Sequence, residues 1–230
     1  MTYPITIVDD FFEDPDSIVK IARECIYSED NFHNYPGVRS KSLDEINPKL
    51  YIHIIQKIFS SSKMKVFTST DIMGVEIGGA LKNVIAIATG ICDGLNLGSN
   101  TRAALVTRGL VEITRIGTKM GAKPETFYGL SGLGDLVLTC TGDLSRNRQL
   151  GIQLGQGKSL EDLTKNMRTI AEGISTVKSA HKLIHKLNIQ ASIMEETFKV
   201  LHENKSPEKA LGDLMMVEIS NEFSGIKGLA

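Results

Sequence analysis

The chain has 230 residues, of which 41% are hydrophobic and 23% are charged, so it matches an ordinary soluble globular protein rather than a disordered or fibrous one. Lys and Arg together number 26 against 27 for Asp and Glu, which leaves no general positive field to hold nucleic acid or an anionic membrane. Any phosphate site must therefore be local.

Cysteine usage and the N-terminus favour a cytoplasmic protein. Cys25, Cys92 and Cys140 are widely spaced and form no C-x-x-C pair, so neither a disulfide framework nor a zinc knuckle is indicated. The first residues, MTYPITIVDDFFEDPDS, are acidic where a secretory signal is basic and then apolar. The most apolar stretch, Val84–Cys92, is much shorter than the roughly 20 residues that span a bilayer, so we expect no membrane span.

The N-terminal part reads as a small α+β segment over residues 1–60. A β-branched run predicts a strand, an Asp-Pro pair opens a helix, and a polar loop with a Pro-Gly turn leads to a second helix and a short strand. The predicted elements are a strand at Ile5–Val8, a helix from Asp14 to about Tyr27, a loop at Ser28–Ser42, a helix from Asn47 to about Phe59, and a strand at Lys65–Thr68. We place the boundary near this last strand, with the small segment over residues 1–60 and the next domain over residues 64–230.

After Asp71 the sequence changes to helical segments with almost no strand, so residues 64–230 predict a mainly α domain. Glycines mark the joins, among them Gly94, Gly98, Gly121, Gly129, Gly132, Gly134, Gly155 and Gly157. The predicted helices are Val75–Asp93, Thr101–Met120, Pro124–Tyr128, Ser145–Leu154, Ala171–Lys186, Ser192–Glu203, and Pro207–Met216 with Ser206 as its cap.

One lysine stands in an unusual place. The helix GVEIGGALKNVIAIATG has Lys82 as its one basic residue, beside Gly78, Gly79 and Ala86. A lysine in small apolar surroundings suits a group that exchanges a proton with an alcohol or carbonyl oxygen. The alternative is a lysine whose stem packs while its amine reaches solvent or a carboxylate.

The segment GLSGLGDLVLTCTGDLSRNRQLG predicts an anion site. Asp135 follows a glycine-rich turn, and Ser145 or Asp143 can cap a helix whose first-turn amides, with Arg146 and Asn147 beside them, would hold a phosphate. The alternative is a polar loop whose arginines, Arg146 and Arg148, pair with surface acids.

Other motifs fail. GIQLGQGKS has five residues between Gly151 and Gly157 where a phosphate-binding P-loop has four, and no dinucleotide fingerprint occurs in the 230 residues. His181 and His185 are four apart on one helix face, but the sequence places no third ligand beside them, so we expect no metal site.

Three motifs in order carry a family resemblance. VFTSTDIMGVEIGGALKNVIAIATGICDGLNLGSNTRAALVTRGL, then GLSGLGDLVLTCTGDLSRNRQLG, then AEGISTV resemble bacterial NAD(P)-dependent glycerol-3-phosphate dehydrogenase over about residues 64–216. The resemblance implies the helical substrate domain of that enzyme, which is like the C-terminal domain of 6-phosphogluconate dehydrogenase. It implies a cytoplasmic oxidoreductase of glycerol-3-phosphate metabolism, between carbohydrate metabolism and phospholipid biosynthesis.

The resemblance also implies residue roles. Lys82 matches the catalytic acid/base, and the glycerol 3-phosphate or dihydroxyacetone phosphate substrate would be held by Asn83, Asp135, Thr139, Ser145, Arg146 and Asn147. Arg146 and Glu172 match contacts to the NAD or NADP cofactor.

The chain departs from the family before residue 64. Family members have a complete Rossmann domain there, whereas the 63 residues that precede Met64 lack its glycine fingerprint. We therefore expect a truncated or fused homologue with negligible turnover alone. A homodimer or a separate nucleotide-binding chain is the expected partner, and the alternative function is a non-catalytic ligand-binding or protein-interaction module. VDDFFEDPDSIVKIA and NYPGVRS resemble the start of 2-oxoglutarate- and iron-dependent oxygenase-like proteins, without the iron-binding motif.

Overall fold

The computed structural model describes residues 27–29, 38–40, 49, 67, 69–165, 172–217 and 226. The chain divides into two compact units, Met1–Thr68 and Ser69–Ala230. The predicted domain boundary, between residues 60 and 64, lies outside the described residues and stays a prediction. The predicted strands at 5–8 and 65–68 and the predicted helices at 14–27 and 47–59 also fall almost wholly outside them.

The N-terminal unit contains a short antiparallel hairpin. Strand β1 (Tyr27–Glu29) pairs with β2 (Val38–Ser40), with Tyr27 opposite Ser40 and Glu29 opposite Val38. The prediction of a loop over 28–42 is wrong at these two strands, and Tyr27, predicted as about the end of a helix, begins β1. Three-residue strands give too short a pattern to detect, because their pairing depends on a partner rather than on local alternation.

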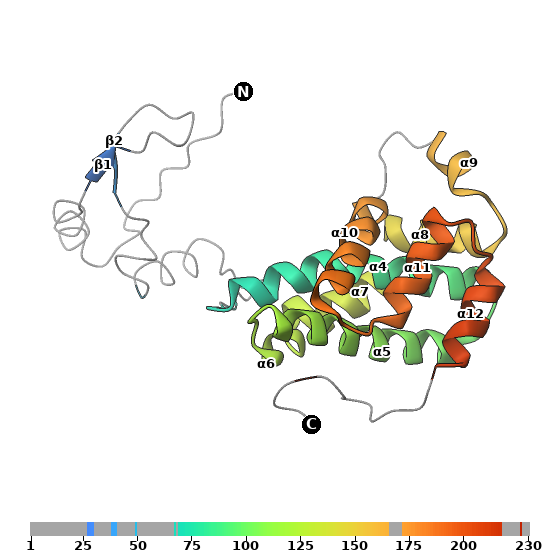
Figure 1. Ribbon diagram of the computed structural model, residues 1–230, viewed down its shortest axis with the longest axis horizontal. Helices are drawn as coiled ribbons and strands as arrows, with labels where there is room; N and C mark the ends of the chain where they lie inside the picture. The colour runs from blue at the N-terminus through green and yellow to red at the C-terminus, as the bar shows by residue number, and fades with distance from the viewer. Residues whose placement is uncertain are drawn as a thin grey trace, which may run out of the picture. The chain divides into compact units, whose positions relative to one another are not determined.

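The second unit is helical, and the residues described in it contain no strand (Figure 1). The prediction of a mainly α domain is therefore confirmed. Its elements are α4 (Ile72–Gly94), α5 (Gly98–Lys119), α6 (Pro124–Phe127), the π-helical turn η1 (Leu130–Gly134), α7 (Asp135–Thr141), α8 (Arg146–Gly155), α9 (Leu160–Lys165), α10 (Glu172–Leu187), α11 (Ser192–His202) and α12 (Pro207–Met215).

Helix α4 forms the centre of this unit. It packs against α5, α7, α8, α10 and α11, and its residues from Val84 to Ile87 are fully buried (Figure 1). By length and composition α4 could cross a membrane, but 72% of its most apolar window is buried inside the fold. The apolar stretch of α4 from Val84 to Cys92 is expected in the core of a protein, and it occupies that position.

Asp71 fixes where α4 begins. Its carboxylate accepts a hydrogen bond from the Gly74 amide at 3.0 Å, which caps the helix. The same carboxylate accepts bonds from the Lys123 amide at 2.9 Å and the Thr126 hydroxyl at 2.6 Å. Burial alone would raise the pKa of Asp71, but the bonds from Thr126, Lys123 and Gly74 outweigh it, so the pKa lies below its usual value. Asp71 therefore ties α4 to α6.

Glycines allow α4 and α8 to cross in close contact. A Cβ added at Gly151 would lie 2.1 Å from the Ile87 carbonyl oxygen, and one at Gly90 would lie 2.1 Å from the Arg148 carbonyl oxygen. Gly94 and Gly155, which we expected at joins, end these two helices and face each other in the same way. These glycines serve helix packing, because backbones that touch leave no room for side chains.

Two elements were not predicted between α6 and α8. The segment GLSGLGD, read as a turn, forms η1, and α7 follows it directly. Helix α9 was also missed. A π-helical turn has no recognisable sequence period, and helices of six or seven residues are too short to establish one.

Candidate functional site

Lys82 and Asp135 form an ion pair between α4 and α7. The Lys82 amine donates to Oδ2 of Asp135, with side-chain exposures of 22% for the lysine and 33% for the aspartate. Thr139, one turn along α7, donates its hydroxyl to the Asp135 carbonyl oxygen at 2.6 Å. This is the arrangement that the alternative described, a packed stem with an amine that reaches a carboxylate. It also brings together three residues that we predicted as site residues.

Close packing of η1 on α4 makes this contact possible. A Cβ at Gly78 would lie 3.0 Å from the Ser131 carbonyl oxygen, and one at Gly132 would lie 2.2 Å from the Phe127 carbonyl oxygen. Only a hydrogen atom fits at Gly132. The π-helical turn therefore lies against α4, one turn of helix before Lys82, and sets the position from which Asp135 meets the lysine.

A second group of predicted residues lies where α8 begins. Ser145 caps α8 by accepting a bond from the Arg148 amide at 3.3 Å, as predicted. Asn147 is 8% exposed, and its side-chain oxygen accepts a bond from the Gly173 amide at 3.0 Å. Asn147 therefore joins the first turn of α8 to the first turn of α10.

Arg146 and Arg148 point in different directions. Arg148 is buried, and its guanidinium contacts Asp93 at 2.8 Å and Asp143 at 3.0 Å. Arg146 is on the surface, with 58% of its side chain exposed, and lies 3.6 Å from Glu172. The alternative of ion pairing thus describes both arginines, since Arg148 pairs with exposed Asp143 and Arg146 pairs with exposed Glu172, although the side chain of Arg146 is still open to solvent.

The predicted residues therefore form two groups along α4. Lys82, Asp135 and Thr139 make up one, and Ser145, Arg146, Asn147 and Glu172 make up the other. Within the described residues, no hydrogen bond or ion pair joins the two groups. Asn83 is half-buried beside Lys82. Each group contains one cation, Lys82 or Arg146, and the second group also includes the first turn of α8.

Neither cysteine of the helical unit offers a nucleophile. Cys92 and Cys140 are free and buried. Burial, with the nearby charge of Asp93, raises the pKa of both thiols to about 11. These two thiols are therefore poorly suited to covalent chemistry.

Solved structures with the same fold are dehydrogenases. The crystal structure of glycerol-3-phosphate dehydrogenase from Coxiella burnetii matches with a TM-score of 0.69 and 41% identity, over 74% of this chain and 52% of that chain. The enzyme from Saccharomyces cerevisiae matches with a TM-score of 0.66 and 26% identity, over 80% of this chain and 51% of that chain. The helical unit therefore has the same fold as the matching part of these two dehydrogenases.

Sequence relatives agree. Residues 71–212 match the family described as NAD-dependent glycerol-3-phosphate dehydrogenase C-terminus, and the chain belongs to that family. Glycerol-3-phosphate dehydrogenase [NAD(P)+] of Geobacter sulfurreducens is 55% identical over 168 residues, which is 73% of this chain and 50% of the relative. That of Syntrophotalea carbinolica is 56% identical over 169 residues, 74% of this chain and 51% of the relative.

The chain spans about half the length of these curated relatives. Residues 1–73 match a different family, described as a family of unknown function, DUF6445. The resemblance of this part to oxygenase-like proteins is not reproduced by that match and stays a prediction.

Proposed function

We propose that the helical unit is the substrate half of a glycerol-3-phosphate dehydrogenase, which interconverts sn-glycerol 3-phosphate and dihydroxyacetone phosphate with NAD or NADP. The observation that carries the proposal is the Lys82–Asp135 pair in a domain that belongs to this family. Lys82 is the catalytic acid/base. Asn83, Asp135 and Thr139 bind the three-carbon substrate beside it.

In the reduction direction, hydride is added to the ketone carbon and the Lys82 ammonium gives its proton to the developing alkoxide oxygen. Asp135 holds the amine in place before the substrate arrives. The Thr139 bond to the Asp135 backbone stabilises the turn of α7 that carries the carboxylate. The hydride itself comes from a bound nicotinamide when one is present.

The phosphate of the substrate binds at the start of α8. The amides of a helix's first turn have no partners within the helix and carry partial positive charge. Ser145 caps this turn, Asn147 fixes it against α10, and exposed Arg146 supplies a guanidinium for the phosphate oxygens. Arg146 and Glu172, which lie 3.6 Å apart, would also contact the NAD or NADP cofactor.

An exposed apolar surface beside the site supports docking of a nucleotide-binding domain. We call it the η1–α7 surface and define it by large hydrophobic side chains on η1, α7 and the segment after it. These are Leu130, Leu133, Val137, Leu138 and Leu144, with exposures from 37% to 96%. A patch of this kind marks an interaction site. Because Asp135 lies within it, a domain that covered this surface would bring its nicotinamide next to Lys82.

The occupant we propose is a nucleotide-binding domain on another chain. The matched relatives are about twice as long as the shared region, and the present 230 residues contain no dinucleotide fingerprint. We propose that residues 64–230 form the substrate domain and that residues 1–60 are a segment from a different family joined to it by fusion. The protein is cytoplasmic in this proposal, and the chain alone has negligible dehydrogenase turnover.

Turnover and binding test the proposal separately. The purified 230-residue chain should oxidise NADH with dihydroxyacetone phosphate no faster than its Lys82→Ala variant. Titration calorimetry with glycerol 3-phosphate should nevertheless show binding that Arg146→Ala weakens by roughly 10- to 100-fold, as loss of a charge-assisted contact of about 1.5–3 kcal/mol implies. Lys158→Ala, which removes another exposed cation of the same unit, is the matched control. Equal affinity of Arg146→Ala and the unchanged chain would contradict the phosphate site.

The second candidate function is a non-catalytic binding or interaction module, which the η1–α7 surface favours. This function predicts that the chain self-associates or binds a partner, and that it shows no turnover either alone or with an added nucleotide-binding domain. Light scattering of the purified chain, with Leu138→Glu and Leu144→Glu as variants of the patch, tests it. A monomer that binds neither glycerol 3-phosphate nor a nucleotide-binding domain would count against both functions.

A further inference from the structure

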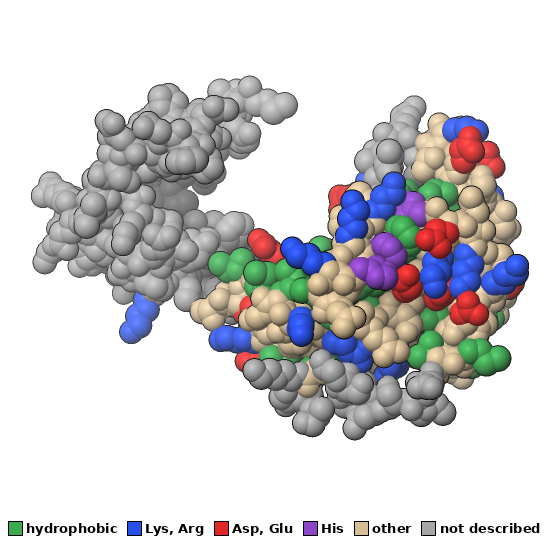
Figure 2. Space-filling view, viewed as in Figure 1, with side chains coloured by type: hydrophobic (Ala, Val, Ile, Leu, Met, Phe, Trp, Pro, Cys, Tyr) green, Lys and Arg blue, Asp and Glu red, His purple; other side chains and the backbone are tan. Residues whose placement is uncertain are grey.

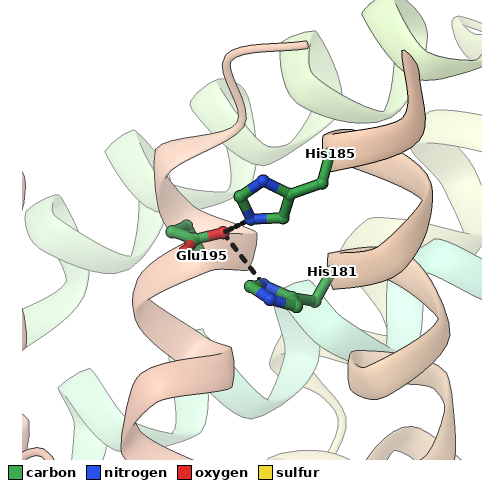
Figure 3. Close-up of side chains that lie close together, drawn as sticks. All are labelled: His181, His185 and Glu195. Carbon is green, nitrogen blue, oxygen red and sulfur yellow. Dashed lines mark hydrogen bonds and ion pairs between the residues drawn. The ribbon is translucent and has the colours of Figure 1, made fainter. Parts of the chain in front are cut away.

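Helices α10 and α11 bring three metal-ligating side chains to one point, away from the proposed substrate site. His181 and His185 are four residues apart on α10, and Glu195 reaches them from α11 (Figure 3). Nδ1 of His181 lies 3.0 Å from Oε2 of Glu195, and Nε2 of His185 lies 3.3 Å from the same oxygen. The expectation that no third ligand stands beside the histidine pair is therefore wrong.

The spacing of these atoms fits a small tetrahedral ion. One donor atom from each side chain lies within 4.8 Å of the other two. Zinc bonds to imidazole nitrogen and carboxylate oxygen are about 2.0–2.2 Å long, so neighbouring ligand atoms in a tetrahedral site are about 3.3–3.5 Å apart. The two nitrogen-to-oxygen distances, 3.0 and 3.3 Å, are at or just below that separation, which small side-chain shifts would restore.

The side chains are both oriented and accessible. The His181 ring stacks on Phe198 of α11, with centroids 3.7 Å apart and planes 6° from parallel, so its direction is fixed. The exposed fraction is 22% for His181, 26% for Glu195 and 63% for His185. Histidine side chains are visible on this face of the helical unit (Figure 2). A metal ion can therefore enter from solvent and keep a fourth position for water.

Both imidazole rings approach one carboxylate oxygen. Two imidazole nitrogens face Oε2 of Glu195, and one donor atom from each of the three residues lies within 4.8 Å of the others, so a single ion can contact all three. Two imidazoles and one carboxylate are ligands that Zn²⁺ and its neighbours prefer, whereas Mg²⁺ and Ca²⁺ prefer oxygen. In catalytic zinc sites the same set of three protein ligands leaves one position open.

We propose that His181, His185 and Glu195 form a binding site for a divalent transition-metal ion, and that this ion is Zn²⁺. The ion clamps α10 to α11. Its binding requires neither the cofactor nor the Lys82 site, so it is separable from the dehydrogenase proposal.

Calorimetry of the full 230-residue chain, stripped with a chelator and titrated with ZnCl₂, tests the site. The expected result is a saturable event of one Zn²⁺ per chain, with no comparable event for MgCl₂. His185→Ala should weaken it at least roughly 10-fold, since losing even an outer partner of a metal ligand has effects of that size. Co²⁺ should give the visible absorption of a tetrahedral complex in the unchanged chain and lose it in the variant.

Two further variants guard the interpretation. Lys186→Ala removes the neighbouring exposed side chain and should bind Zn²⁺ as the unchanged chain does. Glu195→Gln keeps the shape of the side chain and should also weaken binding, and circular dichroism checks that each variant is folded. Zinc isotherms of His185→Ala that superimpose on those of the unchanged chain, or the absence of any saturable event, would overturn the proposal.

Discussion

Replacing Asp71 by alanine should destabilise the helical unit substantially, because one carboxylate holds the start of α4 and its link to α6. The capping bond to the Gly74 amide contributes about 1 kcal/mol. The bonds from the Lys123 amide and the Thr126 hydroxyl contribute about 1 kcal/mol each, which is the value for an ordinary hydrogen bond and lies below the range for a charged acceptor because Lys123 is exposed to water. The expected loss in the free energy of unfolding is therefore about 3 kcal/mol.

Thermal and urea unfolding followed by circular dichroism measure this loss. For a unit of this size, about 3 kcal/mol corresponds to a fall in Tm of about 6–12 °C. Asp71→Asn keeps one acceptor oxygen and should fall between the unchanged chain and Asp71→Ala. Glu76→Ala, an exposed acid on the same helix, is the control and should change little. A melting temperature of Asp71→Ala within 1–2 °C of the unchanged chain would refute the role assigned to this carboxylate.

Two other substitutions test the packing and a buried charge. In urea titrations, Gly151→Ala should lower the free energy of unfolding by about 1–3 kcal/mol, because its Cβ would lie 2.1 Å from the Ile87 carbonyl oxygen. Gly79→Ala, which has open space around it, is the control and should be neutral or stabilising by up to about 1 kcal/mol. Burial raises the pKa of Glu112 from 4.5 to about 7. Between pH 4.5 and pH 7 the folded unit therefore binds one more proton than the unfolded chain, so the free energy of unfolding falls as pH rises through this range. Relative to the unchanged chain, Glu112→Gln should therefore gain on the order of 2–3 kcal/mol between pH 5 and pH 8, and parallel stability curves over that range would contradict this.

The helices that the sequence predicted well are those with a long apolar period. Helix α4 begins three residues before the predicted Val75 and ends one residue after Asp93, and Pro207 with its Ser206 cap begins α12 as predicted. Local signals decide these elements. The hairpin β1–β2, η1 and α7 were missed because strand pairing and a π-helical turn depend on contacts that no local pattern contains.

Parts of the candidate site depended on contacts distant in sequence. Lys82 and Asp135 were each recognised as unusual, but their pairing joins residues 53 positions apart and follows from η1 packing against Gly78. Asn147 was predicted to bind phosphate, whereas its contact with the Gly173 amide could not be read from either segment.

Glu195 was missed for a related reason. It meets His181 only because the chain reverses at Asn188, where φ is 51°, and α11 packs back on α10. An asparagine in the left-handed conformation is a recognisable turn signal. A search for acidic residues on the helix that follows this turn would have found Glu195.

The central claim is that Lys82 and its neighbours are the substrate half-site of a glycerol-3-phosphate dehydrogenase. The most direct measurement supplies the other half: residues 69–230 replace the matching region of the Geobacter sulfurreducens relative, and NADH oxidation with dihydroxyacetone phosphate is followed with and without Lys82→Ala. We predict turnover by the chimera that falls by at least about 100-fold in the variant, as loss of a general acid implies. A folded chimera with no turnover, or turnover that is unchanged by Lys82→Ala, would contradict the claim.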